Sequence, residues 1–339
     1  MKNYCIFELA ALAALTFASC SSESVEDFVG GGNQASQQVA IGFDGYLGRS
    51  AVDTRGSESD LPAIQAKDKG FGVFGNYTAS DKTTPDYGQN MFKNQPVTYS
   101  SEDAKWTYTP VKYWPTAGHI DFLAYAPFDK NQELKNNKEL DFTVDPDVTK
   151  QIDLLWANAA NKTKASGKVN FTFYHALAKI GYSVTSTNND KQTTITVKSL
   201  KLAGNFADEN IKAFYTKGTI DLSKANKADD LWSISDDTKQ NFTLLSDKAL
   251  STENKLTDNL FVIPQDFTGT ANKLYVVVEY TVKTGESEIT NKVYKEISKK
   301  FSQGKAYMIN LTIGLTPIEF EATVESWPND ESIGDFTWN

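Results

Sequence analysis

The sequence predicts an all-β protein built from β-sandwiches, and three observations carry that prediction. Apolar and polar residues alternate with a period of two from residue 38 onward, which is typical of strands buried on one face. Helical periodicity is scarce and reaches at most one or two turns, at 131–140 and 175–178. Gly, Asn, Asp and Pro recur at short intervals and predict the turns between short strands.

The predicted strands follow one another along the chain, each marked by its apolar residues. The first carries Val39, Ile41 and Phe43, and the later ones lie at Trp106–Tyr108, Ile120–Tyr125, Val169–Phe173, Ile195–Val197, Lys273–Lys283, Tyr307–Ile313 and Ile318–Val324. After Lys283, the residues TGES predict a hairpin turn into the next strand. The polar stretch at 161–168 is the best candidate for a domain boundary.

Length, charge and composition exclude several classes of protein. A chain of 339 residues has room for about two domains at roughly 150 residues each. The net charge of −9 argues against a nucleic-acid binder, because phosphate contacts need a basic face. With 2 Cys and 2 His, the chain has too few ligands for a typical Cys/His metal site, and we expect no cofactor.

The first twenty residues have the features of an export signal. A basic Lys2 precedes a short apolar stretch, and FASC at 17–20 is typical of a bacterial lipobox, in which the cysteine thiol accepts a lipid. We therefore expect cleavage before Cys20 and acylation of that residue; the alternative is an ordinary signal peptide with an incidental cysteine. Residues 20–37 predict a flexible tether.

The sequence contains only weak matches to cofactor-binding, cation-binding and catalytic motifs. Residues 70–75 match GxGxxG, but a loop sequence follows in place of a helix, so a glycine-rich strand is the better interpretation. A cation loop at Asp145, Asp147 and Asp153 lacks the ligand alternation of an EF-hand, which favours a solvated turn. His119 and His175 lie far apart in the sequence, and neither has a catalytic motif around it. We therefore expect that the protein is not an enzyme.

The two arginines of the chain fall close together. Arg49 and Arg55 lie in a small, polar, Gly/Ser-containing stretch between the first two predicted strands, whereas the other 32 basic residues (34 − 2) are lysines. Exposed loops of this composition are where proteases cut. An arginine-specific protease would remove one N-terminal strand there; chance placement is the alternative.

Several segments together resemble the fimbrillin family, the subunits of type V pili. They are FASC at 17–20, KGFGVFGNY at 69–77, VKYWPTAGHIDFLAYAPF at 111–128, IDLLWANA at 152–159, VNFTFYHALAKIGYSV at 169–184 and FSQGKAYMINLTIG at 301–314. The resemblance implies two tandem transthyretin-like β-sandwich domains after a lipoprotein signal peptide. The expected divisions are the signal peptide 1–19, the tether 20–37, an N-terminal sandwich 38–167 and a C-terminal sandwich 168–339.

The resemblance also implies assembly into a cell-surface fimbria by donor-strand exchange. An Arg-specific protease would cut after Arg49 or Arg55, which removes the lipid at Cys20 and the strand lined by Val39, Ile41 and Phe43. A C-terminal strand of another pilus subunit would then fill the groove. The implied localisation is the outer membrane and cell surface, and the implied role is adhesion.

The last predicted strand has the pattern that such a donor needs. Its apolar face carries Ile318, Phe320, Ala322 and Val324, and its other face is largely acidic. Burial of the three large side chains contributes roughly 4–9 kcal/mol. The same pattern also suits the last strand of its own domain. A lipid-anchored monomer that binds a glycan or host ligand through exposed aromatic residues is the alternative function, and a glycosidase is a more distant one.

Overall fold

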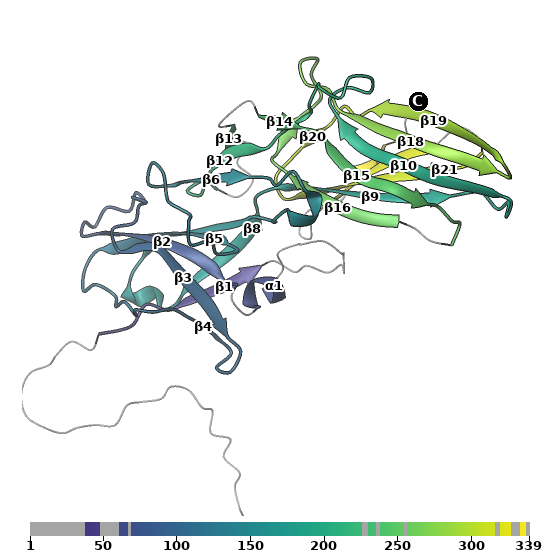
Figure 1. Cartoon of the computed structure of the whole chain (residues 1–339). Coiled ribbons are helices and arrows are strands. Elements are labelled where there is room, and N and C mark those ends of the chain that lie inside the picture. The colour runs from purple at the N-terminus through teal and green to yellow at the C-terminus, as the bar shows by residue number, and fades with distance from the viewer. Residues whose placement is uncertain are drawn as a thin grey trace, which may run out of the picture. The chain divides into compact units, whose positions relative to one another are not determined.

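The computed structural model describes residues 38–47, 61–66, 69–225, 230–234, 238–253, 256–315, 319–326 and 333–336. Strands dominate this part of the chain, which confirms the all-β prediction (Figure 1). The described helical elements are the short α-helix α1 (Leu61–Gln65) and the 3₁₀ turns η1 (Val148–Lys150) and η2 (Lys164–Ser166). Neither 131–140 nor 175–178 is helical, because tertiary pairing places turns and strands there.

The N-terminal strands form one seven-stranded sheet with the order β1-β8-β7-β5-β2-β3-β4. The pair β1–β8 is parallel, and the other neighbours are antiparallel. The bounds are β1 Phe43–Leu47, β2 Phe71–Thr78, β3 Phe92–Ser100, β4 Lys105–Thr107, β5 His119–Ala126, β7 Leu155–Lys162 and β8 Val169–His175.

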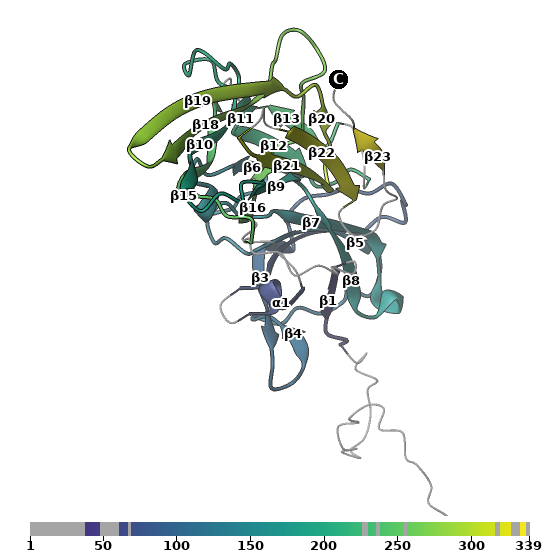
Figure 2. The ribbon, with the colours of Figure 1, turned by 90° about the vertical axis from the view of Figure 1, so that its right-hand side faces the viewer.

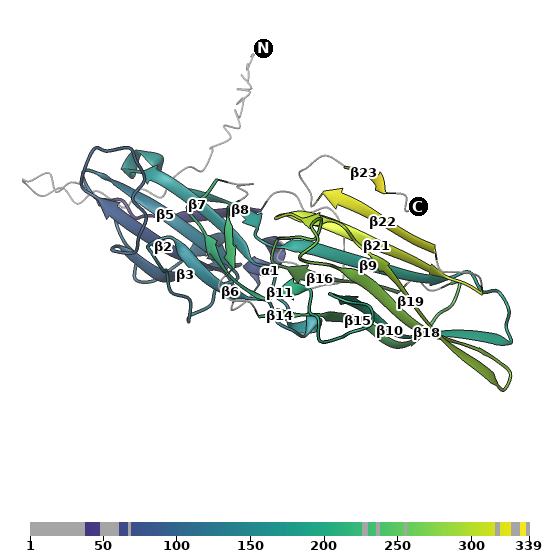
Figure 3. The same ribbon diagram turned by 90° about the horizontal axis from the view of Figure 1, so that it is seen from above.

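Two further sheets are formed mainly by the second half of the chain, and Figure 3 shows their long strands. One has the order β15-β10-β18-β19, with β15 Phe242–Ala249, β10 Thr193–Ala203, β18 Tyr275–Thr284 and β19 Ser287–Glu296. The other has the order β16-β9-β21-β22-β23, with β16 Leu256–Val262, β9 Ala178–Ser186, β21 Lys305–Ile313, β22 Glu319–Ser326 and β23 Ile333–Phe336. The predicted hairpin is confirmed, since Thr284 pairs with Ser287 where β18 turns into β19.

Smaller sheets complete the described fold. Their strands are β6 Glu139–Thr143, β12 Lys217–Asp221 and β13 Trp232–Ile234, the pair β11 Phe214–Tyr215 with β14 Lys239–Gln240, and the pair β17 Gln265–Asp266 with β20 Lys300–Phe301. The pairing of β6 with β12 joins a segment between β5 and β7 to the second half of the chain.

The buried apolar residues form two clusters. One is lined by β1, β2, β3, β5, β7 and β8 and is rich in phenylalanine. The other contains the inward-facing residues of β9, β10, β18 and β21, so the four- and five-stranded sheets bury apolar surface in common, as sandwich sheets do. It also contains Phe74, Leu123, Tyr125 and Trp156 from the seven-stranded sheet, which is therefore buried on both faces in its centre.

The glycine-rich segment is strand β2, as the sequence predicts. A Cβ atom at Gly72 would lie 2.3 Å from Cε1 of Tyr125 on the neighbouring β5. Glycine is needed there because the tyrosine ring lies against the backbone.

Strand β8 begins at Val169, one residue beyond the start of the predicted C-terminal sandwich, and pairs with β1 and β7 of the seven-stranded sheet. The described residues from 38 onward form one compact unit. The division at 167/168 into two tandem sandwiches stays a prediction.

Candidate functional site

Strand β1 fills one edge of the seven-stranded sheet, beside β8 (Figure 2). Its ladder to β8 runs from Phe43 opposite Val169 to Leu47 opposite Phe173. Buried and exposed residues alternate along β1. The buried face also includes Ile41, two residues before the strand begins. A strand of this kind contributes apolar side chains from one face while its other face stays in solvent.

The aromatic ring of Phe43 packs into a ring of aromatic neighbours. The centroids of Phe92, Tyr108, Phe122 and Phe171 lie 5.4, 5.2, 5.6 and 5.9 Å from that of Phe43. Edge-to-face and stacked contacts at these distances stabilise aromatic clusters beyond simple area burial. Phe43 is therefore a central contact by which β1 is held in the core.

Gly45 lies two residues further along the same buried face. A Cβ atom at this position would lie 3.3 Å from Cε2 of Phe173 and 3.5 Å from Cε1 of Phe71. Those distances leave room for a methyl group after a small adjustment, but two rings occupy the space that a larger side chain needs.

The residues just before β1 also form hydrogen bonds with the segment between β4 and β5. The backbone N–H of Ile41 donates to the Lys112 carbonyl oxygen at 2.8 Å, and that of Trp114 donates to the Val39 carbonyl oxygen at 2.9 Å. The Tyr108 hydroxyl also donates to the Ile41 carbonyl oxygen at 2.8 Å. These bonds attach the residues before β1 to the segment between β4 and β5.

Three residues were predicted to line the removable strand, and the structure separates them. Ile41 and Phe43 are buried, whereas Val39 precedes β1 and its exposed fraction is 38%. The buried face continues instead through Gly45 and Leu47. The sequence signal for this longer face was present, since the alternation extends from 41 to 47.

The candidate donor strand corresponds to β22. Its backbone pairs antiparallel with β21, from Glu319 opposite Thr312 to Ser326 opposite Lys305, and β23 pairs with its other edge (Figure 3). In this single chain the segment completes its own sheet, so its donation to another subunit stays a prediction. Ile318, Arg49, Arg55 and Cys20 lie outside the described residues.

Each histidine faces a fully buried carboxylate. His119 Nε2 lies 3.2 Å from Asp121 Oδ2, and His175 Nδ1 lies 2.8 Å from Asp153 Oδ2. The first pair is two residues apart on one strand face, a spacing visible in the sequence, but the second joins residues far apart in the chain. Asp153 was expected in a solvated turn, which is wrong, because the residue is fully buried and its carboxylate contacts His175.

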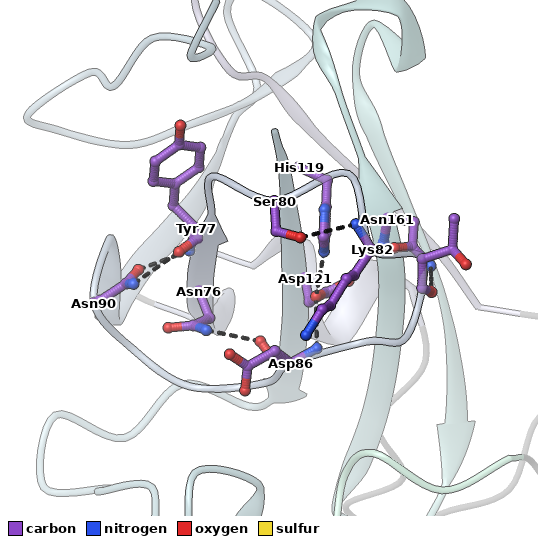
Figure 4. Close-up of polar contacts among 10 residues, drawn as sticks. Asn76, Tyr77, Ser80, Lys82, Asp86, Asn90, His119, Asp121 and Asn161 are labelled. Carbon is purple, nitrogen blue, oxygen red and sulfur yellow. Dashed lines mark hydrogen bonds and ion pairs between the residues drawn. The ribbon is translucent and has the colours of Figure 1, made fainter. Parts of the chain in front are cut away.

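Asp121 connects three segments of the chain, as Figure 4 shows. Its carboxylate accepts hydrogen bonds from the backbone N–H of Asp86 at 2.8 Å and of Asn161 at 2.6 Å. The Asn161 side chain donates to the Thr83 carbonyl oxygen at 2.7 Å, and that of Asn76 donates to the Asp86 carbonyl oxygen at 2.8 Å. This network fastens the loop after β2 to β5 and β7, which is a structural role.

Asp145 and Asp147 form a turn. Asp145 accepts from the Asp147 backbone N–H, and Asp147 caps η1 by accepting from Thr149. The hydrogen bonds from the Thr149 hydroxyl and backbone N–H, together with the nearby Lys150, lower the pKa of Asp147 to about 2. In the part of the chain that the structure describes, no three His, Cys, Asp or Glu residues are grouped to hold a metal, and no helix has the length and apolarity to cross a membrane.

An aromatic cluster lies on the outer side of the four-stranded sheet. The rings of Phe206 and Tyr294 are stacked with centroids 3.6 Å apart, and Tyr275 lies 5.5 Å from Phe206. The exposed fraction of Tyr294 is 49%. The sequence pattern did not predict this cluster, because Phe206 follows β10 in a loop with no alternation.

Comparison with known proteins places the chain in a family. The model of the fimbrillin-like family matches residues 54–327, which span most of the chain. The protein therefore belongs to the fimbrillin-like family, a family of fimbrial structural proteins rather than of enzymes. No curated protein matches the sequence.

Solved structures share the fold. A fimbrial protein from Bacteroides vulgatus is 23% identical with a TM-score of 0.62, covering 86% of this chain and 100% of its own. Candidate cell adhesion proteins from Bacteroides uniformis and Bacteroides ovatus are 18% and 17% identical, with TM-scores of 0.55 and 0.51. They cover 86% and 88% of this chain and 99% and 100% of their own.

Proposed function

We propose that this chain is a structural subunit of a cell-surface fimbria that serves adhesion. It is exported as a lipoprotein, anchored in the outer membrane through lipid on Cys20, and assembled with other pilus subunits by donor-strand exchange. An Arg-specific protease that cuts after Arg49 or Arg55 triggers the exchange. Membership of the fimbrillin-like family supports the fimbrial role.

One observation carries the exchange mechanism, namely the way β1 is held. β1 supplies a single apolar face to the aromatic cluster and pairs with β8 at the edge of the sheet. The chain between β1 and α1 contains both arginines, so a cut there separates this strand from the rest of the fold. A strand from another chain restores the lost backbone pairing and the lost apolar contacts.

The test is brief digestion of the chain from residue 21 onward with an Arg-specific protease, followed by intact mass and a native gel. We expect one cut, after Arg49 or Arg55, and then a ladder of oligomers. The double variant Arg49→Lys, Arg55→Lys is the matched control, because it keeps both charges and removes both cleavage sites. A cut product that stays monomeric, or resistance at both arginines, would contradict the proposal.

The lipid anchor has a separate test. Expression of the full precursor in a bacterial host with labelled palmitate should label the wild-type chain, and Cys20→Ala should remove the label because the thiol is the acylated group. Equal labelling of the variant would contradict the assignment of Cys20.

The cluster of Phe206, Tyr275 and Tyr294, in which Tyr294 is exposed and the other two rings are half-buried, favours a second candidate function, a monomeric surface lipoprotein that binds a glycan. Aromatic faces stack on sugar rings, and the Lys273–Glu296 ion pair lies beside Tyr275. A glycan array should then show binding that Tyr294→Ala abolishes and that Tyr46→Ala, on the exposed face of β1, leaves intact.

A further inference from the structure

Two segments of the chain carry a similar order of residue types at alternate positions. Residues 41–47 read Ile-Gly-Phe-Asp-Gly-Tyr-Leu, and residues 318–324 read Ile-Glu-Phe-Glu-Ala-Thr-Val. At alternate positions the first segment has Ile, Phe, Gly and Leu, and the second has Ile, Phe, Ala and Val. In the first segment these four positions are the buried face of β1 and of the residues leading into it.

We propose that the groove occupied by β1 accepts residues 318–324 of a second copy of this chain in one register and one direction. Ile318 takes the place of Ile41, Phe320 of Phe43, Ala322 of Gly45 and Val324 of Leu47. The inference rests on the proposed function and adds to it a rule for which strand the groove accepts.

The position of Gly45 determines the register. Phe71 and Phe173 leave space there for a methyl group and for little more. In the proposed register the methyl group of Ala322 lies in that space. A shift of two residues in either direction brings Phe320 or Val324 against the two rings, and a shift of one residue turns the acidic face into the core.

The position of Phe43 determines the direction. Four aromatic rings surround its side chain, so an aromatic occupant is required to fill the space. A strand running the opposite way with Ala322 at the Gly45 position places Val324 among those rings and leaves a void. The incoming strand therefore runs parallel to β8, as β1 does.

The outward positions are compatible with the same register. The side chain of Lys168 lies over Gly42, where its Cγ atom is 3.2 Å from the place of a Cβ atom. In the proposed register Glu319 takes the position of Gly42, so its carboxylate comes beside the Lys168 ammonium group. Glu321 replaces Asp44, which keeps an acidic residue at an exposed position.

The experiment uses synthetic peptides of residues 317–326 with the protease-cut chain that begins at residue 21. Native mass spectrometry follows release of the N-terminal fragment with the peptide in large excess. The peptides leave the protein's own sequence unchanged, so folding of the protein does not enter the comparison. We expect the wild-type peptide to displace the fragment, and the Ala322→Leu peptide to do so at least about tenfold more slowly.

The matched control is the Thr323→Leu peptide, which places the same side chain on the outward face and should act within about twofold of wild type. A peptide with residues 318–324 in reverse order should not displace the fragment. Equal displacement by the Ala322→Leu or the reversed peptide would overturn the register and direction but leave strand exchange intact. No displacement by the wild-type peptide, with a cut chain that stays monomeric, would overturn the proposed function as well.

Discussion

Strands β1 and β5 belong to the same sheet but are held in different ways. β5 pairs antiparallel with β2 and with β7, and all 8 of its residues are buried. β1 pairs in parallel with β8, and only every second residue faces the core. Removal of a strand that is buried on both faces and paired on both edges would disrupt the whole sheet. An edge strand with one buried face can be exchanged while its neighbours stay paired.

The largest effect should come from β5. Phe122→Ala removes a ring that contacts Phe43, Phe92 and Phe171 in the centre of the cluster, so it should lower the free energy of unfolding by about 3–5 kcal/mol. Urea denaturation of the chain from residue 21 measures this loss. Val111→Ala, at a residue with an exposed fraction of 49%, should change it by less than about 0.5 kcal/mol. Similar losses in the two variants would contradict the central role of β5.

A somewhat smaller effect should follow from the carboxylate on the same strand. Asp121→Asn weakens the contact with His119 and places an amide near two backbone N–H donors, so we expect a loss of about 3 kcal/mol. Thermal and urea denaturation would measure it. Asp86→Asn is the control, because Asp86 joins the network through its backbone. If the control lost as much stability, the network would not depend on the Asp121 carboxylate.

The attachment of β1 can be weakened without changing its sequence. Tyr108→Phe removes the hydrogen bond to the Ile41 carbonyl oxygen, which should cost about 1 kcal/mol. After the protease cut, release of the N-terminal fragment should be about fivefold faster than in wild type, measured by native mass spectrometry. Tyr99→Phe, at a ring that packs on Trp106, should release it at the wild-type rate. An unchanged rate in Tyr108→Phe would show that this bond does not retain β1.

The effect that is smallest at neutral pH should appear only at alkaline pH. Burial raises the pKa of Tyr125, on β5, and of Tyr87 and Tyr182 to about 12. Because the folded pKa lies above the unfolded value of about 10, this stabilisation is complete below pH 10 and is lost as the pH rises towards 12. Unfolding free energies at pH 8, 10 and 11 should fall in that order, and Tyr125→Phe should reduce the slope. A slope that is unchanged in the variant would contradict the assignment.

Local pattern predicted some elements well and others poorly, for identifiable reasons. The alternation at 307–313 predicts β21, and the glycines at 70–75 predict the close approach of β2 to its neighbour. The continuous apolar run within β5 is the exception to alternation, because this strand is buried on both faces. The short helical patterns failed because residues 139–140, 175 and 178 belong to strands that pair with distant segments, and the other residues form turns or irregular chain.

The candidate site was predicted in outline. Ile41 and Phe43 were identified by alternation, whereas Val39 was placed on the same face although it is exposed. The roles of Gly45 and Tyr108 were not predicted, because each depends on residues brought near by the fold. Pattern analysis of one segment cannot reveal which rings surround it.

The sequence by itself determined the fold class, the signal peptide prediction, the isolation of two arginines behind the first strand, and the resemblance to fimbrillins. These depend on local periodicity and composition, which are properties of neighbouring residues. Only the tertiary structure decided that β1 runs parallel to β8, that four aromatic rings surround Phe43, and that Phe71 and Phe173 limit the space at Gly45. Those facts arise from long-range packing, because the contacting residues come together only when the sheet forms.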